Sequence, residues 1–138
     1  MLRHVAGIAE IVDDFEAAVR FYRDTLGLAV ELKEPGSYAE VKLAGVLHFG
    51  LWQRGHAARS CGVAPDRIPL GFTLGLEVEA VDGAAAALAA RGVALIQAPH
   101  DEPWGQRTAR FLSPSGMLCE VSETPWAREL PEAKAPTT

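Results

Sequence analysis

The sequence has no block of basic residues, no long apolar run and only two cysteines. A net charge of −5 without a Lys/Arg cluster argues against a nucleic-acid-binding surface. The longest apolar runs fall far short of the roughly 20 residues that a membrane-spanning helix needs. We therefore expect a protein that binds neither nucleic acid nor a membrane.

The N-terminal stretch MLRHVAGIAEIVDD also lacks the apolar core of a secretory signal, because Glu10 and Asp13 interrupt it. Cys61 and Cys119 do not have the spacing of a metal site. Both observations favour a cytoplasmic protein in which the two cysteines are plain reduced thiols.

A length of 138 residues with 49% hydrophobic residues suits one compact domain, or two small halves that share a core. Its clearest element is a helix over residues 14–26. Asp13 is a candidate N-cap with Glu16 three residues later, and Gly27 is placed to end the helix. The apolar face recurs with helical spacing and comprises Phe15, Ala18, Val19, Tyr22 and Leu26.

Strands are expected on both sides of this helix. A first strand is predicted at 4–12, and alternating patterns predict others at 28–34, 38–43 and 46–52. Glu10 is an acid within an apolar run. The first strand therefore either lies near a sheet edge at this point or contains a bulge.

The same order of elements returns later in the chain. Residues 71–79 predict a strand, 81–91 an Ala-rich helix, and 93–98, 107–112 and 117–122 three further strands. We therefore expect an α+β fold in a single domain of two βαβββ modules, 4–52 and 71–123. Residues 53–70 show no periodicity and are interpreted as a linker loop. The tail, 124–138, begins with a possible short helical turn at 125–130.

Three stretches carry a resemblance to a known family. They are DDFEAAVRFYRDTLGL at 13–28, RGV at 91–93 after the Ala-rich helix, and PWGQRTARFLSPSG at 103–116 followed by Glu120. In these features the chain resembles the vicinal oxygen chelate superfamily, which includes glyoxalase I, bleomycin-resistance proteins and extradiol dioxygenases. The resemblance spans roughly residues 4–123. It implies sheets that curl around a central cleft, and commonly a homodimer.

The resemblance also implies where a metal would bind. Members that use a divalent ion place a His, Glu or Gln ligand on the first and last strands of each module. Here the matching first-strand positions are Gly7 and Thr73, which are poor or absent ligands, whereas His48 and Glu120 match the last-strand positions. We expect no cofactor. If a metal such as Ni, Zn, Mn or Fe binds, its ligands are His48 and Glu120.

The candidate cleft residues keep alternative interpretations. His48 is either a metal ligand or an ordinary hydrogen-bonded strand histidine. Glu120, the candidate catalytic residue, either binds a metal or pairs with Arg107 or Arg110. Trp104 is either core or a stacking surface in a loop at the cleft mouth. The full predicted cleft set is Tyr38, His48, Trp52, Thr73, Trp104, Arg107 and Glu120.

Three functions compete. The favoured one is a metal-independent binding protein of the bleomycin-resistance type, which holds a small aromatic or cationic molecule. The second is a metal-dependent enzyme with a degenerate site, either a glyoxalase-like lyase, an isomerase or an extradiol-type dioxygenase, using His48 and Glu120 with His4 or His100. The third is an accessory dimer without ligand chemistry.

Overall fold

A computed structural model describes residues 1–127 of the chain. The predicted helical turn at 125–130 is present as a 3₁₀ turn, η3 (Pro125–Ala127), and the rest of that stretch lies outside the described residues. Within residues 1–127, no helix is long and apolar enough to cross a membrane.

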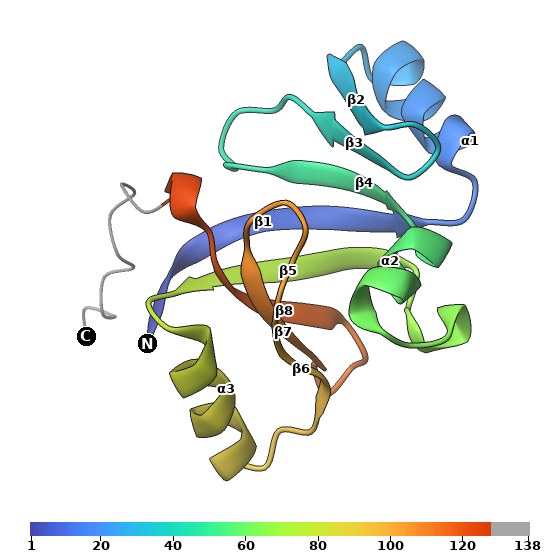
Figure 1. Cartoon of the computed structure of the whole chain (residues 1–138). Helices are drawn as coiled ribbons and strands as arrows, with labels where there is room; N and C mark the ends of the chain where they lie inside the picture. Colours follow the sequence, from blue (N-terminus) through green and yellow to red (C-terminus); the bar gives the residue numbers. More distant parts are fainter. Residues whose placement is uncertain (128–138) are drawn as a thin grey trace.

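Two similar modules follow one another along the chain (Figure 1). The first contains β1 (Leu2–Val12), α1 (Phe15–Arg20), the π-helical turn η1 (Phe21–Thr25), β2 (Val30–Glu34), β3 (Tyr38–Val41) and β4 (Phe49–Gln53). The second contains β5 (Gly71–Val78), α3 (Val81–Ala90), β6 (Leu95–Asp101), β7 (Arg107–Leu112) and β8 (Leu118–Glu123). The α+β class is confirmed, and each predicted strand is present with ends shifted by up to three residues.

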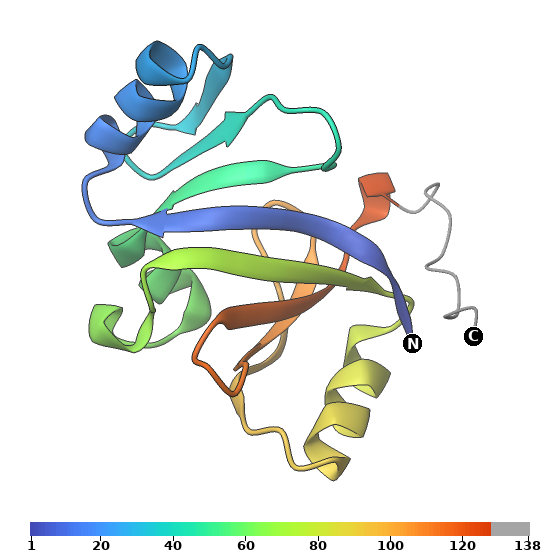
Figure 2. The same cartoon turned by 180° about the vertical axis from the view of Figure 1, so that it is seen from behind.

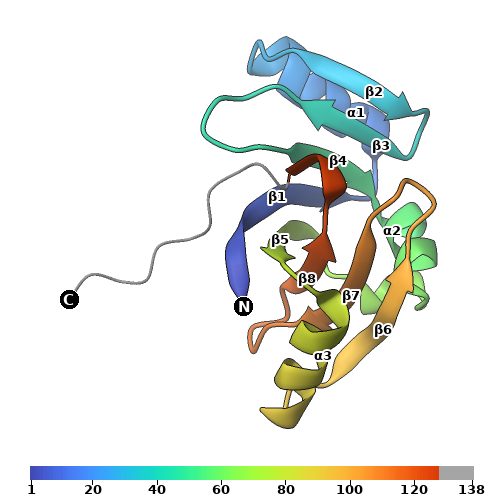
Figure 3. The same ribbon diagram turned by 60° about the vertical axis from the view of Figure 1, so that its left-hand side comes forward.

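One mixed sheet contains all eight strands, in the order β2-β3-β4-β1-β5-β8-β7-β6. The first and last strands of each module pair in parallel, β1 with β4 and β5 with β8. The modules join where β1 pairs antiparallel with β5, and Figure 2 shows these two strands side by side between α1 and α3. The sheet curls strongly (Figure 3), so both modules contribute to one concave face.

Three apolar clusters hold these layers together. On the convex face, Phe15 and Val19 of α1 pack on the first module, and Val81 and Ala84 of α3 pack on the second. The third cluster lies on the concave face and includes Ile11 of β1. The convex clusters explain why both amphipathic helices are needed, since each covers its own half of the sheet.

The first helix differs from its prediction at both ends. Asp14, not Asp13, caps it, because its Oδ1 accepts a hydrogen bond from the Ala17 amide at 3.0 Å. From Phe21 onward the backbone forms a π-turn, which has more residues per turn than an α-helix and so rotates Leu26 off the apolar face. Leu26 is accordingly 50% exposed, while Phe15 and Val19 are buried as predicted.

The interpretation of 53–70 as a structureless loop is wrong. It contains the helix α2 (Arg54–Cys61) and a short 3₁₀ turn, η2 (Pro65–Arg67). The Gln53 side chain caps α2 by accepting from the His56 amide at 3.0 Å. Only small residues of α2 are buried, namely Ala57, Ala58 and Cys61, so the sequence carries no strong amphipathic signal here. The helix closes one end of the concave face (Figure 1).

Glu10 lies on a central strand, so the sheet-edge explanation is wrong. The bulges of β1 occur earlier, between Leu2 and His4 and between Val5 and Gly7. Glu10 is tolerated because the Tyr22 hydroxyl donates a hydrogen bond to its Oε1 at 2.9 Å. A carboxylate on a sheet face needs such a donor when it is partly buried.

Candidate ligand-binding cleft

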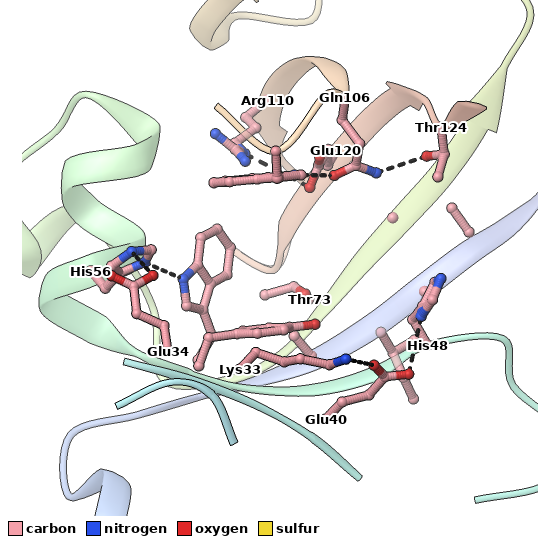
Figure 4. Close-up of a pocket in the computed structure, with 18 of the residues that line it drawn as sticks. Lys33, Glu34, Glu40, His48, His56, Thr73, Gln106, Arg110, Glu120 and Thr124 are labelled. Carbon is pink, nitrogen blue, oxygen red and sulfur yellow. Dashed lines mark hydrogen bonds and ion pairs between the residues drawn. The ribbon is translucent and has the colours of Figure 1, made fainter. Parts of the chain in front are cut away.

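A cavity of about 570 Å³ occupies the concave face of the sheet. That volume is in the range typical of small-molecule sites. Its aromatic walls are Tyr38, Trp52, Trp104 and Trp126, and its charged or titratable groups are Lys33, Glu34, Glu40, His48, His56, Arg110 and Glu120. Figure 4 shows Arg110, Glu120, Gln106 and Thr124 on one side of the cavity, with Lys33, Glu40 and His48 on the other.

All of the predicted cleft residues except Arg107 line this cavity. Arg107 instead binds two exposed carboxylates, Asp82 at 2.9 Å and Asp101 at 3.0 Å. It therefore belongs to a surface ion-pair cluster, and its place in the predicted cleft set is corrected. The arginine of the cleft is Arg110, three residues further along β7 and on the opposite face of that strand.

Arg110 is almost completely buried, with its side chain 1% exposed. Its Nη1 lies 2.8 Å from Glu102 Oε1, 2.6 Å from Gln97 Oε1 and 3.2 Å from the Ser60 carbonyl oxygen. Its guanidinium also lies over the Trp52 ring, 5.6 Å from the centroid. The guanidinium is thus held in the cavity wall by Glu102, Gln97 and the Ser60 carbonyl, and not by Glu120.

Glu120 is a cavity carboxylate that is not among the hydrogen-bond partners of Arg110. Its Oε2 is 3.8 Å from Arg110 Nε, which is an ionic contact but too long for a hydrogen bond. Arg110 Nε is itself buried and has no hydrogen-bond partner among the described residues. Burial raises the pKa of Glu120, and the nearby Arg110 charge only partly offsets that effect. An added cation or hydrogen-bond donor in the cavity would therefore stabilise the ionised carboxylate.

Three of the four positions expected to hold a metal, Gly7, His48 and Glu120, lie in one row across the central strands. Gly7 of β1 pairs with Gly75 of β5, and Gly75 pairs with Glu120 of β8. On the other side of Gly7 stands His48, since a Cβ built on Gly7 would lie 3.1 Å from His48 Cβ. The second-module counterpart of Gly7 is therefore Gly75. Thr73 pairs with Ala9 and so lies outside this row, which corrects its prediction as a ligand position. It does line the cavity.

His48 has both ring nitrogens engaged. Nε2 accepts a hydrogen bond from Trp126 Nε1 at 3.0 Å, and Nδ1 lies 3.2 Å from Glu40 Oε1. Because Nε2 is the acceptor, Nδ1 carries the proton and donates it to Glu40. Neither nitrogen is free to bind a metal without breaking one of these contacts.

These residues do not fit a divalent ion. Two of the four row positions are glycines, His48 is committed elsewhere, and Glu120 alone remains. Within residues 1–127, no group of three or more His, Cys, Asp or Glu side chains is arranged to hold one. His100 contacts Glu102 at 2.9 Å, and His4 stands opposite Glu77, so neither completes the row.

The two glycines are required by close backbone approach. A Cβ on Gly75 would lie 3.2 Å from the Gly7 carbonyl oxygen, part of a neighbouring strand that cannot easily move.

Gly75→Ala is expected to destabilise the fold by about 1–3 kcal/mol, the usual cost of overpacking. Gly83→Ala in α3 meets nothing within 4 Å and should stabilise it by about 0.4–1 kcal/mol. Urea denaturation measures the free energy of unfolding of both variants, which should fall for Gly75→Ala and rise for Gly83→Ala. Equal stability of the two variants would contradict the close packing at Gly75.

The aromatic walls are also fixed in place. Trp52 donates its indole N–H to His56 Nδ1 at 2.8 Å, and Trp104 donates to Gln106 Oε1 at 2.7 Å. The Tyr38 ring packs over Gly50, where a Cβ would come within 2.6 Å of it. Burial raises the pKa of Tyr38 to about 12, so its phenol is neutral at physiological pH. The walls thus offer flat apolar surfaces around a carboxylate.

Several of the lining residues are not predicted from the sequence. The most important are Glu40, His56, Gln106 and Trp126. Glu40 occupies the cavity-facing position of the alternating strand 38–43, two residues after Tyr38, so strand periodicity could have identified it. His56 depends on the unrecognised helix α2, and Trp126 follows the last predicted strand, so neither has a local signal.

Comparisons with known proteins agree with the family resemblance of the sequence and with the fold. The model of the Glyoxalase/Bleomycin resistance protein/Dioxygenase superfamily matches residues 2–121. The uncharacterized protein YraH of Bacillus subtilis (strain 168) is 30% identical over 116 residues, covering 80% of this chain and 91% of YraH.

Solved structures of low sequence identity share the fold. A glyoxalase/bleomycin resistance protein/dioxygenase superfamily member from Vibrio splendidus 12B01 matches with a TM-score of 0.62 and 18% identity, covering 90% of this chain and all of that chain (100%). A Streptomyces coelicolor methylmalonyl-CoA epimerase matches with a TM-score of 0.60 and 22% identity, covering 91% and 99%. At these identities the likeness concerns the fold alone.

Proposed function

Since the chain belongs to the glyoxalase/bleomycin resistance protein/dioxygenase superfamily, we propose that it is a small-molecule-binding protein that works without a complete metal site. Its guest is a small, flat organic cation. The observation that carries this proposal is Glu120, a cavity-facing carboxylate to which residues 1–127 donate no hydrogen bond, in a row where Gly7 and Gly75 supply no metal ligand.

Charge supports a cationic guest. Behind the cavity wall, Glu77 and Glu102 are buried, and Glu120 is 20% exposed in its side chain. Among the described residues, Arg110 is the one Lys or Arg that is buried with these carboxylates. It is already bound to Glu102. Buried charges are costly unless they are paired, so this region favours a positive group next to Glu120.

The shape of the cavity supports a flat guest. Tyr38, Trp52 and Trp104 line it together with Glu120. A cation near the face of such rings gains about 0.5–2 kcal/mol from the ring quadrupole, more when water is excluded. A planar cation satisfies the carboxylate with its charged end and covers the aromatic surfaces with its ring.

Thermal unfolding of chelator-treated protein tests this proposal. Flat organic cations should raise the stability, by about 2.7 kcal/mol when present at a hundred times Kd, with or without EDTA. Neutral analogues and 2-oxoaldehyde adducts serve as comparison ligands. Absence of any shift across cationic aromatic compounds would contradict the proposal and favour an accessory role.

The alternative function, a metal-dependent lyase, isomerase or dioxygenase, has its own test. Protein purified without added metal is titrated with Ni²⁺, Zn²⁺ or Mn²⁺ by calorimetry. Stoichiometric binding that is abolished by both Glu120→Ala and His48→Ala would overturn the metal-independent proposal. Homodimer formation, which the family resemblance implies, stays a prediction that light scattering can check.

A further inference from the structure

The residues after β8 form a separate part of the cavity wall. Thr124 is anchored to the second module, where its amide donates to Glu77 Oε2 at 2.9 Å and its hydroxyl accepts from Gln106 Nε2 at 2.7 Å. Ala127 is buried, with 1% exposed. The short turn η3, which Figure 1 shows as the red turn near the end of the ribbon, is therefore fixed at both of its ends.

Trp126 connects this turn to the other module. Its indole N–H donates to His48 Nε2 at 3.0 Å, and the two rings meet edge to face with centroids 6.4 Å apart. His48 precedes β4, in the first module, so the contact spans the cleft from one module to the other. The hydrogen bond fixes the orientation of the indole at the cavity.

Most of the Trp126 surface nevertheless remains available. The residue lines the cavity and is 53% exposed. Large aromatic residues supply most of the contact energy where they become covered by a ligand. An indole that is held along its edge keeps apolar ring surface available for a flat ligand.

This wall lies after the residues that the superfamily model matches. The superfamily match ends at residue 121, before Thr124. The matched range includes His48 but not Trp126, which contributes its indole from the segment after β8. A large, half-exposed aromatic side chain at this edge of the cavity is well placed to determine which ligands fit.

We propose that Trp126 is a specificity-determining residue that contacts the bound ligand and selects extended, flat ring systems. This inference rests on the proposed function, with Glu120 binding the positive end of the ligand. A ligand with several fused rings reaches Trp126, whereas a single-ring cation bound at Glu120 depends on it less.

Two probes separate these cases in a calorimetric titration. The extended probe is 9-aminoacridine, and the single-ring probe is benzamidine. Trp126→Ala should weaken binding of 9-aminoacridine on the order of tenfold and change benzamidine binding by less. Trp126→Phe, which keeps an aromatic face but loses the hydrogen bond to His48, should give an intermediate loss.

Phe21→Ala is the matched control, because Phe21 is also exposed (48%) and does not line the cavity. It should leave both affinities unchanged, and circular dichroism verifies that each variant folds. If the wild-type protein binds both probes and Trp126→Ala binds 9-aminoacridine as tightly, the inference about Trp126 is wrong. If the wild-type protein binds neither probe, the proposed function itself fails.

Discussion

Replacing Arg110 with methionine will lower the free energy of unfolding by about 3–5 kcal/mol, the usual cost of breaking a buried ion pair. The side chains of Arg110 and Glu102 are 1% and 2% exposed, and Nη1 is 2.8 Å from Oε1. Without the guanidinium, Glu102 loses its buried counter-ion and Glu120 loses the cation that lies 3.8 Å from its Oε2. Urea denaturation followed by circular dichroism measures the loss.

Arg107→Met is the matched control on the same strand. Arg107 makes two ion pairs, yet its partners Asp82 and Asp101 are exposed, so the variant should unfold almost like the wild type. The double variant Arg110→Met with Glu102→Gln should recover part of the lost stability, because it removes both buried charges. If Arg110→Met were no less stable than Arg107→Met, the buried network would not support the cleft as described.

Replacing Glu120 with glutamine will weaken the binding of a cationic ligand such as benzamidine by roughly 10- to 100-fold, the value of a charge-assisted hydrogen bond. The amide keeps the size of the side chain and removes its charge. Affinity should also fall as the pH decreases through the pKa of Glu120, because the protonated carboxyl cannot pair with a cation. That pKa is raised by burial, so the loss begins at a higher pH than for an ordinary glutamate.

Glu79→Gln controls for the change in net charge. Glu79 is exposed and does not line the cavity, so its replacement alters the protein charge by the same amount without touching the ligand. Its affinity for benzamidine should match that of the wild type. A similar loss in both variants would mean that long-range charge, and not contact with Glu120, attracts the cation.

The sequence predicted the fold well because its signals are local. The apolar faces of 14–26 and 81–91 specify the two covering helices, and alternation specifies the strands. The missed helix α2 shows the limit of this approach. Its buried residues are Ala57, Ala58 and Cys61, which are too small to give the periodic apolar pattern that identifies a helix.

Parts of the site escaped prediction because they depend on register between strands. Gly7 lies eight residues before α1 begins at Phe15, whereas Gly75 lies six before α3 begins at Val81. Counting the same offset in both modules therefore selects Thr73 in place of Gly75. The sequence alone does not show that the segment between the row position and the start of the helix is two residues shorter in the second module.

Arg107 is predicted in the cleft in place of Arg110 for the same reason, because the register between strands is not visible in the sequence. The two positions are three residues apart and so point to opposite faces of β7. Only the pairing of Arg110 with Glu120 across β7 and β8 shows which arginine faces the cavity. Trp126 is a different case, because it reaches the site through a contact between modules that are distant in sequence.

A titration of chelator-treated protein with benzamidine and with its neutral isostere benzamide tests the central claim most directly. The two molecules share a flat ring and nearly the same shape, and differ in charge. We expect benzamidine to bind at least tenfold more tightly than benzamide, without added metal, and to lose this preference in Glu120→Gln. Equal binding of both molecules, or binding that appears only after Zn²⁺ or Ni²⁺ is restored, would contradict a metal-independent cation site at Glu120.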